Sequence, residues 1–194
     1  MTMTRPRRRV LAWMGIVLAT VAAIVLRPVT PAAARGEQSL MVAVPDGFGM
    51  VFKHDAPDGS MKMMEFVPTG ETVDNWKQMI TVQHFPKLAG GDPRELASRW
   101  SQRLLATCPS AKISSQPQGA VNGLPATRIY VHVTECGERP PESVLALVIK
   151  GGDAMHMIQH AWRPLPPTPE QLRAATADFD RARLCAAGDI ACAR

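Results

Sequence analysis

The sequence predicts an α+β domain in which a mostly antiparallel sheet is flanked by two main helices, after an N-terminal signal or anchor helix. Two observations predict this class. Short apolar or alternating segments are separated by turns rich in Gly, Pro and Asp, which is typical of strands joined as hairpins. Two segments, Asp92-Pro93-Arg94-Glu95 and Thr168-Pro169-Glu170-Gln171, carry the capping residues and the proline with which helices begin.

The first half of the domain contains four predicted strands and one helix. The strands are 40–44, 48–54, 61–67 and 79–85, and the second and third are expected to form a hairpin. A polar segment at 71–78 could form one helical turn around Trp76. The helix begins after the capping residue Asp92 and ends near Thr107. It should bury a stripe of side chains that recur every four residues: Leu96, Trp100 and Leu104.

The second half contains four more predicted strands and the second helix. The strands are 111–116, 127–134, 143–150 and 154–162, arranged in two hairpins. The segment 143–150 is almost entirely apolar, which predicts a central position in the sheet. The second helix begins after Thr168 and runs to about Ala186, with apolar residues at helical spacing.

Residues 1–34 have the three regions of a secretory signal peptide. A cluster of arginines precedes an apolar run at 10–26, and small residues end the segment at Ala32 and Ala34, so we expect cleavage after Ala34. Alternatively the run stays as an inner-membrane anchor, since a spanning helix needs about 17–25 residues. Arg8-Arg9-Val10-Leu11 also resembles a twin-arginine signal, so the export route stays open. Each route predicts a periplasmic or secreted protein.

The positive charge of the chain belongs to this leader. The whole sequence has 22 Lys and Arg against 17 Asp and Glu, and five of the arginines lie within residues 1–34, which contain no acid. The remaining residues therefore carry no net charge. A basic chain would normally suggest a nucleic-acid partner, but here that inference would depend on residues that the mature protein is expected to lose. We therefore expect no nucleic-acid partner, and membrane contact only through an uncleaved leader.

Residues 35–39 are expected to be a linker and 40–194 a single domain, large enough to bury a core of its own. This domain contains all four cysteines, and an even number in an oxidising compartment predicts two structural disulfides. Of the three possible connectivities we favour Cys108 with Cys136 and Cys185 with Cys192. A hairpin turn at Asn122-Gly123 would bring the first pair together, and the second would close a short C-terminal loop.

The chain resembles the PsbP-like superfold, which photosystem-associated lumenal proteins share with small bacterial envelope proteins of the DcrB type. The resemblance lies in the order of elements over residues 40–186, in the segment Val44-Pro45-Asp46-Gly47-Phe48, and in Glu71-Thr72-Val73-Asp74-Asn75-Trp76 before a strand. It implies an exported, non-catalytic protein that acts as an assembly factor or binding module. The metal and partner contacts of that family have no counterpart here, so the resemblance assigns no functional residue.

Methionine and histidine form the one constellation that suggests chemistry. Met61, Met63 and Met64 lie in one predicted strand, and 155–160 is a second strand with the sequence Met-His-Met-Ile-Gln-His. Thioether and imidazole groups suit Cu(I), which indicates a possible copper site. Its candidate ligands are Met61, Met63, Met155, His156, Met157 and His160. The competing interpretation is that these methionines fill the core and that no cofactor is bound.

Three functions are consistent with the sequence. The first is a non-catalytic envelope module that binds a protein or a small ligand. The second is a copper-binding accessory protein, which requires Met61 or Met63 to lie beside Met155 and Met157. The third is a hydrolase whose histidine, hydroxyl and carboxylate meet only in the fold, since the sequence contains no nucleophile, metalloprotease or phosphate-binding motif.

Overall fold

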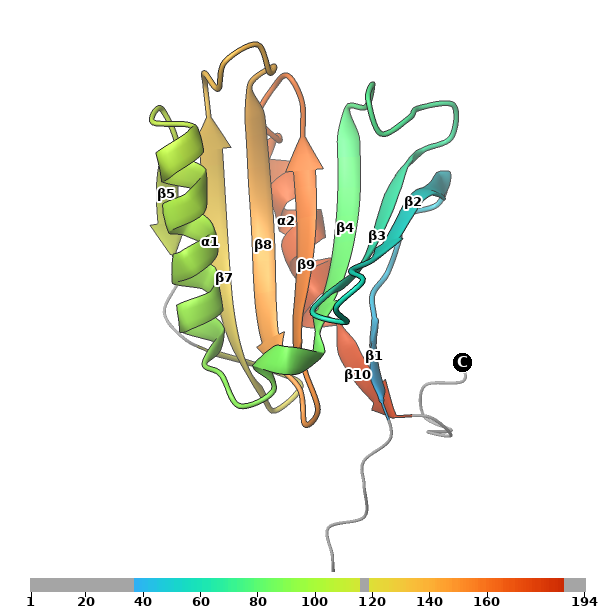
Figure 1. The fold of residues 1–194 in the computed structure, drawn as a ribbon. Helices are drawn as coiled ribbons and strands as arrows, with labels where there is room; N and C mark the ends of the chain where they lie inside the picture. Colours follow the sequence, from blue (N-terminus) through green and yellow to red (C-terminus); the bar gives the residue numbers. More distant parts are fainter. Residues whose placement is uncertain (1–36, 116–118, 187–194) are drawn as a thin grey trace, which may run out of the picture. The chain divides into compact units, whose positions relative to one another are not determined.

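The computed structural model describes residues 37–115 and 119–186 (Figure 1). Its helices are η1 (Pro86–Leu88), α1 (Pro93–Thr107) and α2 (Pro169–Asp180). Its strands are β1 (Gln38–Met41), β2 (Phe48–Asp55), β3 (Lys62–Pro68), β4 (Gln78–Phe85), β5 (Lys112–Ser115), β6 (Gly119–Val121), β7 (Leu124–Val133), β8 (Glu142–Lys150), β9 (Met155–Trp162) and β10 (Arg183–Ala186). No helix among the described residues is long and apolar enough to cross a membrane.

The predicted α+β class with an antiparallel sheet is confirmed. The large sheet has the order β2-β3-β4-β9-β8-β7-β5, with β6 paired to β7, and each of these pairs is antiparallel. The helices α1 and α2 lie on opposite faces of it (Figure 1). We call the face under α1 the front and the face under α2 the back. β8 is buried along its length between the two layers, as its unbroken apolar sequence predicts.

The turn at Asn122-Gly123 forms as the sequence predicts. Both residues have positive φ, 50° and 78°, the left-handed conformation that Asn and Gly tolerate and that a tight hairpin needs. The strands on either side run antiparallel and bring Cys108, at the end of α1, to Cys136, beyond the end of β7. These two cysteines form a disulfide with their Cα atoms 4.7 Å apart, which confirms this pairing. Cys192, the predicted partner of Cys185, lies outside the described residues.

Both helices begin where their capping residues predict. The Asp92 side chain accepts a hydrogen bond from the backbone N–H of Arg94, at the start of α1. At α2 the Thr168 hydroxyl accepts from the N–H of Gln171, whose side chain accepts in return from the N–H of Thr168. On the front, α1 packs Leu96, Trp100 and Leu104 onto β7 and β8, so the predicted stripe is confirmed.

Several boundaries differ from the predictions, and the short strand β6 was not predicted. Residues 71–77 form bends and irregular backbone rather than a helical turn, Gln78 begins β4, and Trp76 is buried against the core. The second helix ends at Asp180 rather than near Ala186, and Arg183–Ala186 forms β10, which pairs antiparallel with β1. β1 begins at Gln38, so two residues of the predicted linker belong to a strand. The helical spacing of apolar residues continues past Asp180. In the structure, however, the backbone N–H and C=O groups of Arg183–Ala186 form hydrogen bonds with β1 instead of with a further helical turn. The predicted leader, residues 1–34, lies outside the described residues.

Candidate functional site

The three strands β3, β4 and β9 carry different chemistry on their two faces. Successive residues of a strand point to opposite faces, so the side chains at odd and even positions lie on different faces of the sheet. The register places Met63, Gln83 and Met157 side by side across the three strands, and these residues face the front. The next position along places Lys62, His84 and His156 side by side, on the back. The front therefore presents thioethers and amides, and the back presents imidazoles.

The front of these strands is open to solvent as a cleft of about 310 Å³, which we call the front cleft. It exists because α1 packs onto β7 and β8 and leaves β3, β4 and part of β9 uncovered (Figure 1). Its lining comes from these strands, from the segment before β4 and from two residues at the end of β8 and β9: Met63, Glu65, Val73, Trp76, Met79, Thr81, Gln83, Glu142, Gln159, Ala161 and Arg163.

Two glutamines organise the floor of the front cleft. Gln159 Nε2 donates to Gln83 Oε1 at 3.0 Å, and Gln83 Nε2 lies 3.6 Å from the sulfur of Met61 and 3.5 Å from that of Met63. Gln159 Nε2 is also 3.9 Å from the sulfur of Met157. Thioethers are weak acceptors, so these amides keep most of their hydrogen-bonding capacity for another partner.

Glu65 is the acid of the front cleft that lacks an ion pair. It is half-buried, and no hydrogen bond or salt bridge joins it to the rest of residues 37–115 and 119–186. Burial raises the pKa of its carboxyl group above the usual value. The other acid of the cleft, Glu142, pairs with Arg163, whose guanidinium also stacks 4.0 Å over the Trp76 ring. Glu65 therefore gives the cleft an uncompensated negative charge whenever it is ionised.

The back of the same strands holds a pair of histidines, of which His156 is buried and His84 is partly exposed. His84 and His156 are cross-strand neighbours of β4 and β9, and their Nδ1 atoms lie 3.5 Å apart. His156 is 1% exposed, and its Nε2 has no hydrogen-bond partner. Burial, and next the proximity of His84, lower the pKa of His156 to about 4. Its imidazole is therefore neutral near pH 7.

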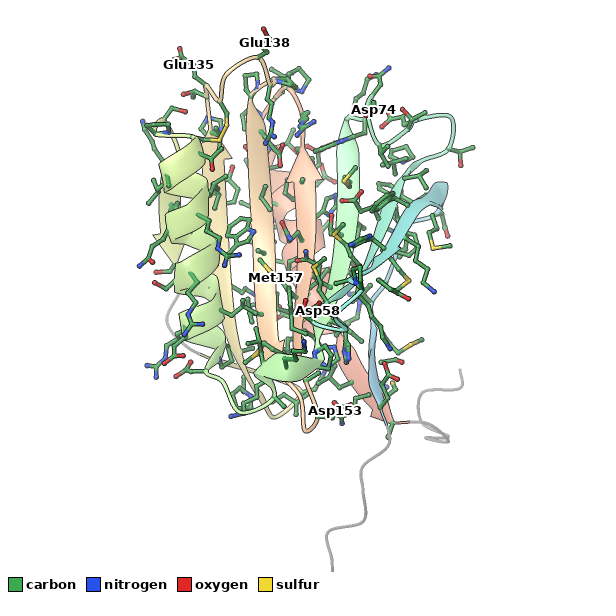
Figure 2. The ribbon with its side chains drawn as sticks, in the orientation of Figure 1. Asp58, Asp74, Glu135, Glu138, Asp153 and Met157 are labelled. Atoms are coloured by element: carbon green, nitrogen blue, oxygen red, sulfur yellow. A yellow bond between two sulfur atoms is a disulfide. The ribbon has the colours of Figure 1, made fainter. Side chains whose placement is uncertain are left out.

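β1 covers the two histidines on the side away from the sheet. The backbone N–H of Gln38 donates to Asp153 Oδ2 at 2.8 Å, and Gln38 Oε1 accepts from the N–H of Gly152 at 2.7 Å, so β1 is fastened to the turn between β8 and β9 (Figure 2 labels Asp153). Gly151 leaves room for this contact, because a Cβ there would lie 2.9 Å from Gln38 Oε1. Glu37 is thereby placed with its Oε1 3.8 Å from His84 Nε2.

A cavity of about 190 Å³ lies between β1 and the back of β2, β3, β4 and β9, and we call it the histidine pocket. Its lining includes His84 and His156, the thioether residue Met64, and a rim in which Lys53 and Lys62 alternate with Glu37 and Asp55. Lys62 and Glu37 form an ion pair across the mouth.

The predicted copper ligands fall on both faces of the sheet. The sulfurs of Met61 and Met63 both lie near Gln83 Nε2 on the front, and Met157, labelled in Figure 2, is the cross-strand neighbour of Gln83 on the same face. Met155 is buried under the segment after η1, where it is the side chain nearest to Gly91. His156 and His160 lie on the back, where His160 stacks on Trp162 and bonds Gln78. The residue that sequence reasoning missed is His84, whose partnership with His156 appears only once β4 and β9 are aligned.

One histidine of the described chain does lie beside a hydroxyl, as the hydrolase hypothesis requires. His132 Nδ1 is 2.9 Å from Ser143 Oγ across β7 and β8. Ser143 is only 1% exposed, however, and neither residue lines the front cleft or the histidine pocket. The hydroxyl is therefore placed as a satisfied core group, out of reach of a substrate.

Comparison with known proteins supports the fold. No known protein family matches the sequence, and no curated protein matches it. Among solved structures, the chain is similar to LpqN, described as involved in cell envelope biogenesis of Mycobacterium tuberculosis, with 12% identity, a TM-score of 0.50, and coverage of 79% of this chain and 87% of LpqN. It is also similar to PA94 of Pseudomonas aeruginosa, a protein of unknown function, with 10% identity, a TM-score of 0.43 and coverage of 75% and 93%. A mutant of the protein Mog1 matches with 15% identity, a TM-score of 0.41 and coverage of 73% and 83%. The chain thus shares its α+β fold with LpqN.

Proposed function

We propose that this chain is an exported, non-catalytic binding module of the cell envelope, of PsbP-like fold, and that it binds a partner protein in the front cleft through a cationic group of that partner. The observation that carries this proposal is the unpaired Glu65 in an open cleft whose floor consists of two half-free glutamine amides. A buried or half-buried acid without a counter-ion destabilises a fold, so its presence in a cleft is better accounted for by a ligand that supplies the positive charge.

The surroundings of Glu65 suit a protein side chain better than a small apolar ligand. Trp76 and Met79 supply apolar walls against which the stem of a lysine or arginine can pack. Gln83 and Gln159 supply donors and acceptors for the backbone of an extended segment. The fold shared with LpqN, a protein described as involved in cell envelope biogenesis, and the Cys108–Cys136 disulfide support an envelope location.

The test is affinity capture from envelope extracts with three baits: the wild-type protein, Glu65→Lys, and Glu170→Lys as a matched control. Glu170 is exposed on α2, on the other face of the sheet. We expect one protein to be retained by the wild type and by Glu170→Lys but not by Glu65→Lys, with retention that falls as salt rises, because the contact is electrostatic. Equal capture by the three baits, or no specific partner, would contradict the proposal.

A further inference from the structure

We infer that His84, His156 and Met64 form a Cu(I) site in the histidine pocket. This inference concerns the back of the sheet and does not depend on the binding function proposed for the front cleft. It also differs from the copper site expected from sequence, since only His156 belongs to both sets. The argument rests on the spacing of the two imidazoles, on the orientation that Glu37 imposes, and on the donor types that the pocket supplies.

The spacing of the two histidines is also the spacing that a shared metal ion would give. Their Nδ1 atoms are 3.5 Å apart, at the long limit of a hydrogen bond. Two nitrogen ligands of one ion, each with a bond of about 2.0 Å, are separated by about 3.3–3.5 Å when the ion is three- or four-coordinate. The backbone register of β4 and β9 therefore sets the two nitrogens at ligand spacing before any ion is bound.

The Glu37 carboxylate selects the useful tautomer of His84. Its Oε1 lies 3.8 Å from His84 Nε2, so its negative charge favours the tautomer that carries the proton on Nε2. Nδ1 of His84 is then unprotonated and directed at Nδ1 of His156. A carboxylate on the distal nitrogen is the usual second partner of a metal-binding histidine. His156 Nδ1 faces it at 3.5 Å and can offer a lone pair as well when the ring proton lies on Nε2.

The donor types indicate copper rather than zinc. The two imidazoles are the nitrogen donors of the pocket, and the candidate for a third donor is a thioether. Met64 lines the same pocket and faces the back like His84 and His156. A thioether selects Cu(I), and two imidazoles are compatible with it.

The test is an anaerobic titration of the purified exported protein with Cu(I) against a chromogenic Cu(I) chelator. We expect one Cu(I) per chain, bound at least about tenfold more weakly by His84→Gln and by Met64→Leu. Two matched controls, His54→Gln on β2 and Met157→Leu on the front, should bind as the wild type does. X-ray absorption at the copper edge should show a sulfur ligand in the wild type that Met64→Leu lacks.

Each other outcome overturns the site. Wild-type protein that fails to compete with the chelator, or that binds Zn²⁺ and not Cu(I), excludes it. Loss of binding in Met157→Leu moves the ion to the front of the sheet. Circular dichroism checks that each variant is folded. If His84→Gln is unfolded, Met64→Leu is the decisive variant, because the exchange of Met for Leu conserves side-chain volume.

Discussion

The front and the back of β3, β4 and β9 are made from alternate residues of the same three strands, yet they differ in what covers them. On the back, α2 and the pair β1–β10 enclose the side chains, so the histidines there are desolvated. On the front, α1 covers only β7 and β8. The amides, thioethers and one acid of the neighbouring strands therefore lie in an open cleft. The strands determine which residues share a face, and the covering layers determine whether that face is core or site. Four predictions test this contrast.

The largest effect is expected where α2 closes the back. Phe179 is 1% exposed and is the largest fully buried side chain of the helix. Replacing it with alanine removes the contact between α2 and the sheet and leaves a cavity, so we expect Phe179→Ala to lower the free energy of unfolding by about 3–5 kcal/mol. Met63→Ala, on the open front, should cost under about 1 kcal/mol. Urea unfolding measures both, and similar losses would show that the two faces are equally enclosed.

The second effect concerns the half of the front that is covered. The disulfide between Cys108 and Cys136 spans 28 residues and ties the end of α1 to the sheet. In the chain-entropy description a loop of this length contributes about 3.5 kcal/mol. We therefore expect the double variant Cys108→Ala, Cys136→Ala to lose about that much stability, measured by urea unfolding under oxidising conditions. An unchanged unfolding midpoint would mean that α1 is held by packing alone.

The third prediction uses pH to report on the enclosure of the back. Burial lowers the pKa of His160 to about 4 from the usual 6.5. Between these values the unfolded chain binds a proton that the folded chain does not, so this group's contribution is complete above pH 6.5 and is lost as the pH falls toward 4. The loss amounts to about 3 kcal/mol. His160→Phe should make the fall of stability between pH 6.5 and 4 shallower, and a parallel curve would show that His160 is hydrated.

Most of this arrangement could be predicted from local sequence. Alternation along β9 separates Met155, Met157 and Gln159 from His156, Ile158 and His160, and the structure confirms that they face opposite sides. The turn at Asn122-Gly123 and the capping residues of both helices also act locally, so they too are found where the sequence predicts them.

What could not be predicted depends on partners distant in the chain. His84 and His156 are 72 residues apart, and their alignment is set by the packing of the whole sheet, not by either strand. β10 was missed because Ala182 continues the helical spacing of α2, and only the presence of β1 makes the following residues a strand. The open front cleft exists because α1 packs on β7 and β8 and on no further strand. No motif in the sequence encodes that position.

The smallest expected effect on stability belongs to the residue that we hold responsible for binding. Burial raises the pKa of Glu65, which means that its ionised form destabilises the fold above that pKa. Glu65→Gln removes the charge and keeps the shape, so it should raise the unfolding midpoint slightly at pH 7, by an amount reduced by the solvent in the cleft. At pH 4, where the wild-type carboxyl is largely protonated, the two proteins should be nearly equal in stability.

Glu65→Gln should also fail to retain the captured partner. A substitution that raises stability and abolishes binding distinguishes a binding residue from a structural one. A side chain kept for the fold alone would lower stability when replaced, as Phe179 should. A side chain that costs stability and is needed for binding indicates that the front of the sheet is left uncovered for a ligand. Thermal unfolding and envelope capture, measured on one preparation of Glu65→Gln, decide between these cases. A destabilised variant that still retains the partner would show that Glu65 stabilises the fold and does not bind the partner.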